Sequence, residues 1–160
     1  MESNFDSIMA KQKVHYEDIK LLVEQRIDKY RDKSFIEKYA LYMGMVQILE
    51  LQIKQILHSK FSFETDEQFE RLEKMTLGQA VRCLKDKNVR PDIIHLLEHN
   101  RDNRNDMAHS FLANTIMNTS LGFSLGSIEF RHLDKYIVEL ENVILFWEWC
   151  IHNDALLADD

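Results

Sequence analysis

The segment from Phe35 to Leu57 constrains the fold more than any other part of the chain. Its apolar residues recur every three or four positions, and others widen the stripe. The repeating set is Tyr42, Met45, Leu49, Ile53 and Ile56, and the widening set is Leu41, Val46, Ile48 and Leu57. A helix that is apolar over so much of its circumference packs against neighbours on more than one side. Ser34 and Glu37 form a capping-box pattern ahead of it, which predicts where this central helix begins.

Similar patterns predict further helices before and after this segment. The one at the start of the chain is more charged than the central segment and therefore more peripheral. Thr65 with Gln68, and Thr76 with Gln79, are capping pairs that predict two short helices. Pro91 suits the first turn of the helix after them. The predicted spans are residues 5–31, 66–75, 77–87 and the segment that begins at Pro91.

The closing segment predicts a long amphipathic helix. One face carries Leu133, Tyr136, Ile137, Leu140, Ile144, Trp147 and Ile151. Phe146, Trp149 and Cys150 lie on another face, which indicates a second contact, either in the core or between subunits. Two glycines and several hydroxyl residues at 118–127 predict a loop, with a small hairpin as one form.

Composition indicates a single all-α domain. Four glycines and one proline are too few for the turns of a β-sandwich or barrel. We predict one domain over residues 1–160, an all-α bundle of five or six helices. Cys83 and Cys150 lie far apart and fit an unbridged, cytoplasmic protein. The chain begins without a signal-peptide pattern, and its longest apolar stretch, 39–49, is too short to span a bilayer.

The net charge of −7 is unevenly distributed. From Arg82 to Arg104 there are six basic residues and four acidic ones, whereas residues 129–160 contain eight acidic and two basic ones. A locally basic segment can bind a polyanion, but the overall balance excludes a broad, sequence-blind coating of DNA.

One literal motif points to zinc chemistry. His95, Glu98 and His99 spell H-x-x-E-H, in which two imidazoles on one helix face hold a zinc ion and the glutamate activates water. Enzymes with this signature are far larger and need a third ligand downstream. Leu96 and Leu97 also fall where any amphipathic helix places them. We therefore expect no metal site and no other cofactor, and interpret these histidines as partly exposed surface residues.

The stretch RDNRNDMAHSF (101–111) is the strongest candidate for a functional site. On an unbroken helix Arg104 and His109 lie roughly 140° apart around the axis and do not share a face. We therefore predict an interrupted helix, with Arg104 at a helix start or in the preceding turn and His109 one turn inside. Such an arginine favours phosphate, and a nearby histidine can move a proton. Metal-free RNA cleavage needs both, because a 2′-hydroxyl must be deprotonated to attack the phosphorus.

The run Arg104-Asn105-Asp106-Met107-Ala108-His109 resembles the R-x4–6-H signature of the HEPN superfamily (higher eukaryotes and prokaryotes nucleotide-binding domains). The resemblance extends over most of the chain, through two long N-terminal helices, MTLGQAVRCL, LLEHNRDNRNDMAH and a closing amphipathic helix. It implies a homodimer in which the two motifs meet in one composite site. Many HEPN proteins are metal-independent ribonucleases, often toxins paired with an antitoxin or parts of antiviral systems.

The resemblance also implies roles for individual residues. Arg104 stabilises the phosphate, His109 moves or positions a proton, and Asn105 orients both. Apart from the resemblance, Arg101 is a further candidate contact for phosphate or RNA, with a merely solvated side chain as the alternative. In the subgroup paired with a nucleotidyltransferase antitoxin, a tyrosine two residues after the histidine is modified. Phe111 occupies that position here and has no hydroxyl, which argues against this mode of neutralisation.

Plainer interpretations of the same residues stay open. Arg104 can pair with Asp102 or Asp106 in a surface ion pair of little energy, and His109 can be a half-buried core histidine. The alternative function, from a different class, is a non-catalytic helical dimer that binds a nucleotide or a partner protein through the same groove.

Overall fold

The protein is all-helical throughout the part of the chain that is described. The computed structural model describes residues 16–61, 66–122 and 127–158. Their elements are α2 (Tyr16–Ile27) with a 3-10 turn (Asp28–Tyr30), α3 (Phe35–Lys60), α4 (Asp66–Lys74), α5 (Leu77–Asp86), α6 (Pro91–Asp106), a π-helical turn (Met107–Phe111), α7 (Leu112–Ser120) and α8 (Ser127–His152). If α6, the π turn and α7 are counted as one continuous helix, these residues form six helical segments, in agreement with the prediction.

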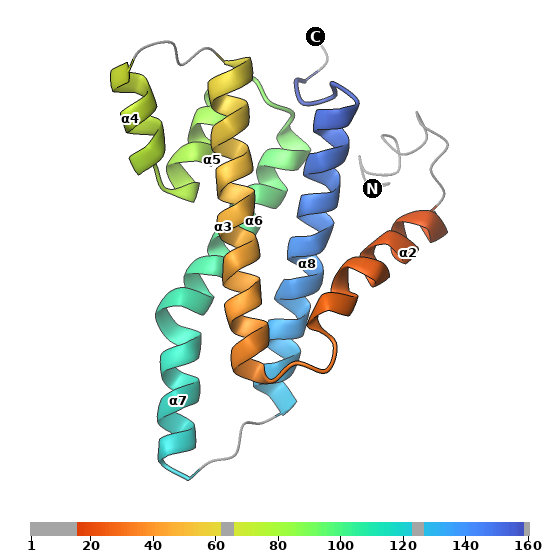
Figure 1. Ribbon diagram of the computed structural model, residues 1–160, viewed down its shortest axis with the longest axis vertical. Helices are drawn as coiled ribbons and strands as arrows, with labels where there is room; N and C mark the ends of the chain where they lie inside the picture. Colours follow the sequence, from red (N-terminus) through yellow and green to blue (C-terminus); the bar gives the residue numbers. More distant parts are fainter. Residues whose placement is uncertain (1–15, 62–65, 123–126, 159–160) are drawn as a thin grey trace.

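Helix α3 is central, with α6 and α8 beside it and α4 and α5 at one end (Figure 1). Its start at Phe35 is set by the predicted capping box, in which Ser34 and Glu37 each bond to the other's backbone. Its buried residues are Phe35, Tyr42, Val46, Leu49, Ile53 and Leu57. The stripe is narrower than predicted, since Ile48 is 48% exposed.

The other local signals position the elements around the site. Thr76 and Gln79 form the predicted capping box at the start of α5, and Pro91 is the first residue of α6. The Thr65 signal before α4 lies outside the described residues, as does the part of the 5–31 helix that precedes Tyr16.

The prediction that the helix is interrupted before Arg104 is wrong. Helix α6 runs unbroken from Pro91 to Asp106, so Arg104 lies in its last turn. The polar run stays helical because Asn103 is on the core face, 5% exposed, where its side chain is paired. The Asn103 amide donates to Glu139 Oε2 on α8 at 2.7 Å. Tertiary contacts therefore offset the weak helix preference of asparagine.

The predicted loop at 118–127 is also shorter than expected. Residues 118–120 belong to α7 and Ser127 begins α8, so these four positions are helical, while residues 123–126 lie outside the described part. Gly122 follows the end of α7 with φ of 85°, a left-handed conformation that glycine adopts without strain.

The second face of α8 makes its contact within the chain. Phe146 and Cys150 are buried, and the Arg90 guanidinium lies over the Phe146 ring at 5.4 Å. Beside them, Val89 and Leu157 form an isolated antiparallel bridge. Burial raises the pKa of the Cys150 thiol to about 11, so this free cysteine is protonated and unreactive at neutral pH. No helix among the described residues is both long and apolar enough to cross a membrane.

Candidate functional site

A π-helical turn that contains His109 follows directly on the last turn of α6, which contains Arg104. It spans Met107–Phe111, and the Tyr39 hydroxyl on α3 donates to the Met107 carbonyl at 3.1 Å. A side chain that binds a carbonyl in this way stabilises a local departure from α-helical hydrogen bonding, and such turns recur at functional sites. Because a π turn contains more residues than an α turn, the angle between Arg104 and His109 falls below the roughly 140° of an ideal helix.

Arg104 is partly buried and has a neutral partner. Its Nη1 donates to Asn105 Oδ1 at 3.1 Å. The two neighbouring carboxylates are bound elsewhere, since Asp102 accepts from Arg101 Nε at 2.9 Å and Asp106 accepts from the Tyr136 hydroxyl at 3.1 Å. The interpretation of Arg104 as half of a surface ion pair with either aspartate is therefore wrong.

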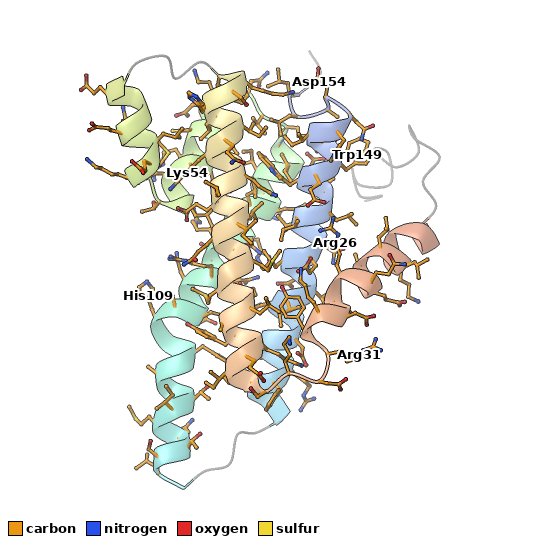
Figure 2. The ribbon with its side chains drawn as sticks, viewed as in Figure 1. Arg26, Arg31, Lys54, His109, Trp149 and Asp154 are labelled. Carbon is orange, nitrogen blue, oxygen red and sulfur yellow. The ribbon has the colours of Figure 1, made fainter. Side chains whose placement is uncertain are left out.

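Arg104, Asn105 and Arg101 line one cavity of about 440 Å³. Its other walls come from α3, the end of α4 and the start of α5, and they are formed by Glu50, Lys54, Glu73, Lys74, Met75, Thr76, Leu77 and Gly78. Figure 2 shows Lys54 projecting from α3 toward α4 and α5. We call this space the Arg104 cavity. Four cationic and two acidic side chains line it, so its local charge is positive in an acidic protein.

The helix start beside Arg104 belongs to α5 rather than to its own helix. Thr76 Oγ1 accepts the Gln79 N–H at 3.3 Å, and Gln79 Oε1 accepts the Thr76 N–H at 2.8 Å. The first N–H groups of an α-helix have no acceptor within the helix, so those of Leu77 and Gly78 are the first-turn donors beside the cavity. Together with a guanidinium, such donors favour an oxyanion.

Helix α3 contributes Lys54 to the cavity wall and carries two tyrosines that the charge of Arg104 affects. Lys54 Nζ lies 2.8 Å from Glu50 Oε1 and donates to the Glu73 carbonyl at 3.2 Å, so it is held at the cavity wall. Burial raises the pKa of Tyr39 and of Tyr42, and the positive charge of Arg104 acts against the shift at both phenols. Arg104 therefore interacts electrostatically with the phenols of two α3 tyrosines. Sequence patterns gave no sign of these interactions.

His109 does not line the Arg104 cavity. It lies in the π turn and is exposed, and Figure 2 shows it projecting away from the helix bundle. The interpretation of His109 as a half-buried core histidine is therefore wrong. Phe111 at the end of the turn is packed instead, stacked on Phe35 with ring centroids 5.7 Å apart. Within one chain, three of the four candidate residues meet in the cavity and the histidine stands outside it.

The H-x-x-E-H residues do not converge on one point, since His99 and Glu98 have different partners. His95 is exposed, and His99 Nε2 lies 3.2 Å from Glu139 Oε2 on α8. Glu98 is 3.8 Å from Lys85 Nζ. Within residues 16–61, 66–122 and 127–158, no group of three His, Cys, Asp or Glu residues is arranged to hold a metal ion.

The fold and the site thus define an all-helical protein with a cation-lined cavity beside a π turn. No protein-family model, curated protein or solved structure matches this chain.

Proposed function

We propose that this protein is a metal-independent endoribonuclease of HEPN type that acts as a homodimer. The observation that carries the proposal is the partly buried Arg104, bound to Asn105 and facing a positively charged cavity beside the first turn of α5. A guanidinium with a neutral partner keeps its charge available for a ligand. The likeness of the Arg104–His109 run to the R-x4–6-H signature supports the same conclusion.

The proposed reaction is transesterification of RNA. The 2′-hydroxyl loses its proton to a base, the O2′–P bond forms, and the P–O5′ bond breaks as O5′ takes up a proton. The products are a 2′,3′-cyclic phosphate and a 5′-hydroxyl. Arg104 binds the charge that develops on the phosphorane, and Asn105 holds the guanidinium in position through the 3.1 Å hydrogen bond. His109 supplies or accepts the proton.

A dimer accounts for the position of His109. The imidazole is exposed on the π turn and outside the cavity of its own chain, so it is accessible to a second copy. In the proposed arrangement, the His109 of each subunit completes the Arg104 cavity of the other. In a symmetric dimer both subunits make the same contact, so the two composite sites form together.

The biological role we propose is that of a cytoplasmic toxin or defence effector, restrained by an antitoxin or another partner protein. Phe111 is stacked on Phe35 and offers no hydroxyl for modification, so the proposed partner acts by another route.

A non-catalytic dimer that binds a nucleotide or a partner protein is the second candidate. The observation that favours it is the separation of His109 from the cavity, because an anion site needs no proton carrier. The cavity has the volume of a small-ligand site, which suits a nucleotide.

RNA cleavage in EDTA separates these functions. We expect the wild type to cleave and both Arg104→Ala and His109→Ala to lose about a hundredfold or more in rate, since each removes a group that acts in the transition state. Arg31→Ala and His95→Ala are matched controls at exposed positions and should cleave normally. Intact RNA with the wild type, or normal cleavage by both site variants, would exclude the ribonuclease.

Mixing the two inactive variants tests the composite site. A dimer of one Arg104→Ala and one His109→Ala subunit contains one site with both groups intact. Random mixing should therefore restore roughly a quarter of the wild-type activity. Persistent inactivity in a mixture that forms mixed dimers would place both groups in the same subunit's site.

A further inference from the structure

A second cavity adjoins the Arg104 cavity. It has a volume of about 390 Å³ and lies between α4 and α5, where Arg71, Arg82 and Asp86 line it. Lys74 and Met75 line both cavities, so the two spaces share a wall at the junction between α4 and α5. Figure 1 shows α4 and α5 at one end of α3, with α5 next to the upper part of α6.

Positive side chains outnumber negative ones along the two cavities. The cationic set is Arg71, Lys74, Arg82, Lys54, Arg101 and Arg104, which we call the basic track. Three carboxylates also line the spaces, and one of them, Glu50, is paired with Lys54 at 2.8 Å. The whole chain has a net charge of −7, so this surface is positive in a protein that is acidic overall.

The fold sorts the basic segment of the sequence into two groups. Arg82, Arg101 and Arg104 line the cavities, although 22 positions separate the first from the last. The other cations of the segment lie elsewhere. Arg90 is bound to Asp92 at 2.7 Å, and Lys85 lies 3.8 Å from Glu98. The basic track is thus formed by three-dimensional packing, because its members come from α3, α4, α5 and α6.

We propose that the basic track binds the backbone of single-stranded RNA and leads the strand into the Arg104 cavity. The proposal rests on the ribonuclease function and adds the path of the substrate. Proteins that hold single strands use a positive groove that follows the phosphates, with apolar surface for bases or sugars. Met75 and Cys83 supply such surface here. Each cavity has the volume of a small-ligand site, which fits one nucleotide unit of a single strand and is too small for a duplex.

The test compares two double variants of equal charge change. Arg71→Gln/Arg82→Gln removes two cations of the basic track outside the Arg104 cavity. Lys85→Gln/Lys87→Gln removes two exposed cations from the end of α5 that line neither cavity. Binding of a 2′-O-methyl RNA oligonucleotide, which cannot be cleaved by 2′-hydroxyl attack, is measured by fluorescence anisotropy over a range of salt concentrations. Circular dichroism and thermal melting establish that both variants are folded.

We expect the track variant to bind roughly tenfold more weakly than the control variant. The slope of log K against log salt should fall by about 0.7 for each phosphate contact that is lost. Equal affinity of the two variants, or no RNA binding by the wild type, would overturn the basic track. Competition by poly-glutamate as strong as that by RNA of equal charge would overturn RNA as the ligand and indicate an acidic protein.

Cleavage of a dinucleotide keeps this result separate from the ribonuclease proposal. Each of the two cavities fits one nucleotide unit, so a dinucleotide makes only part of the contacts of a longer strand. The track variant should therefore lose a smaller factor in cleavage rate on the dinucleotide than on the longer strand. If the wild type cleaves neither substrate but its RNA binding still depends on the basic track, the ribonuclease proposal fails and the basic track stands. If cleavage is normal and the two double variants bind RNA equally well, the basic track fails and the ribonuclease proposal stands.

Discussion

Two regions of the molecule have cationic side chains at partly buried surface. In one region carboxylates neutralise the cations, and in the other the arginine has a neutral partner. Where α2 meets α8, Arg26 and Lys29 surround Glu141, which is 0% exposed. Lys29 Nζ lies 2.6 Å from Glu141 Oε1, the Tyr30 hydroxyl donates to the same oxygen at 2.8 Å, and Arg26 also pairs with Glu148. Figure 2 shows Arg26 between the two helices. At the end of α6, the hydrogen-bond partner of Arg104 among the described residues is the neutral Asn105 amide.

This comparison distinguishes cations that are neutralised within the fold from cations that are available to bind a ligand. A buried carboxylate is tolerated when cations and hydrogen bonds offset its desolvation, and those cations then have little charge to offer a ligand. Arg104 and its neighbours line a cavity in which positive charge is in excess, which raises the free energy of the empty site and favours an anion. Each prediction below changes one of the two regions, and the first compares them directly.

The largest effect is expected from Lys29→Met. The substitution leaves Glu141 buried with Tyr30 and a distant Arg26, whose Nη1 is 3.9 Å from Oε2. Loss of one partner of a buried pair costs 3–5 kcal/mol, and we expect about 3 kcal/mol because Lys29 is 35% exposed. Urea unfolding measures the change. Arg104→Met, which breaks no ion pair, should change the free energy of unfolding by less than about 1 kcal/mol. Equal losses would remove the contrast between the two regions.

A smaller, pH-dependent effect is expected at Tyr30. Burial, and next the charge of Glu141, raise the pKa of its phenol above the ordinary value of 10.0. The folded state therefore favours the protonated phenol. This contribution is fully present below about pH 10 and is lost as the pH rises above the unfolded-state pKa, by up to about 1.4 kcal/mol for each pH unit.

Tyr30→Phe tests this dependence. It removes the 2.8 Å hydrogen bond to Glu141 and should cost about 1–2 kcal/mol at pH 7. Its unfolding free energy should fall less steeply than that of the wild type between pH 9.5 and 11, as measured by denaturant unfolding at several pH values. Parallel pH curves for the two proteins would show that this phenol does not link stability to pH.

Helix starts and the Arg104 site also differ in how far they could be predicted from the sequence. Capping at Ser34 and Thr76 depends on residues within one turn, so both helix starts were predicted from local sequence. The prediction of an interrupted helix at Arg104 was wrong because the burial of Asn103 depends on Glu139, 36 residues away. The cavity was not predictable, since it forms only where four helices meet. The composite site with His109 stays a prediction.

The smallest effect is expected from Gly78→Ala, and it tests how closely Arg101 must be placed. A Cβ at this position in the first turn of α5 would lie 3.1 Å from Arg101 Cδ, a tight contact that a small movement of the arginine relieves. Charge and cavity lining are otherwise kept. We expect RNA affinity to fall by about two- to threefold while stability changes by less than about 1 kcal/mol, because alanine also favours the helix.

Gly44→Ala is the matched control, since a Cβ there meets nothing within 4 Å. It should stabilise α3 by about 0.5–1 kcal/mol and leave the anisotropy titration with RNA unchanged. If the two alanine variants bind RNA equally well, the present position of Arg101 is not needed, and any phosphate contact it makes comes from a mobile charge. If only Gly78→Ala weakens binding, the α5 helix start and the arginine act together. RNA binding would then depend on the position of the Arg101 charge as well as on its presence. The cavity would therefore differ from the α2–α8 ion pairs in the position of its charge as well as in the amount.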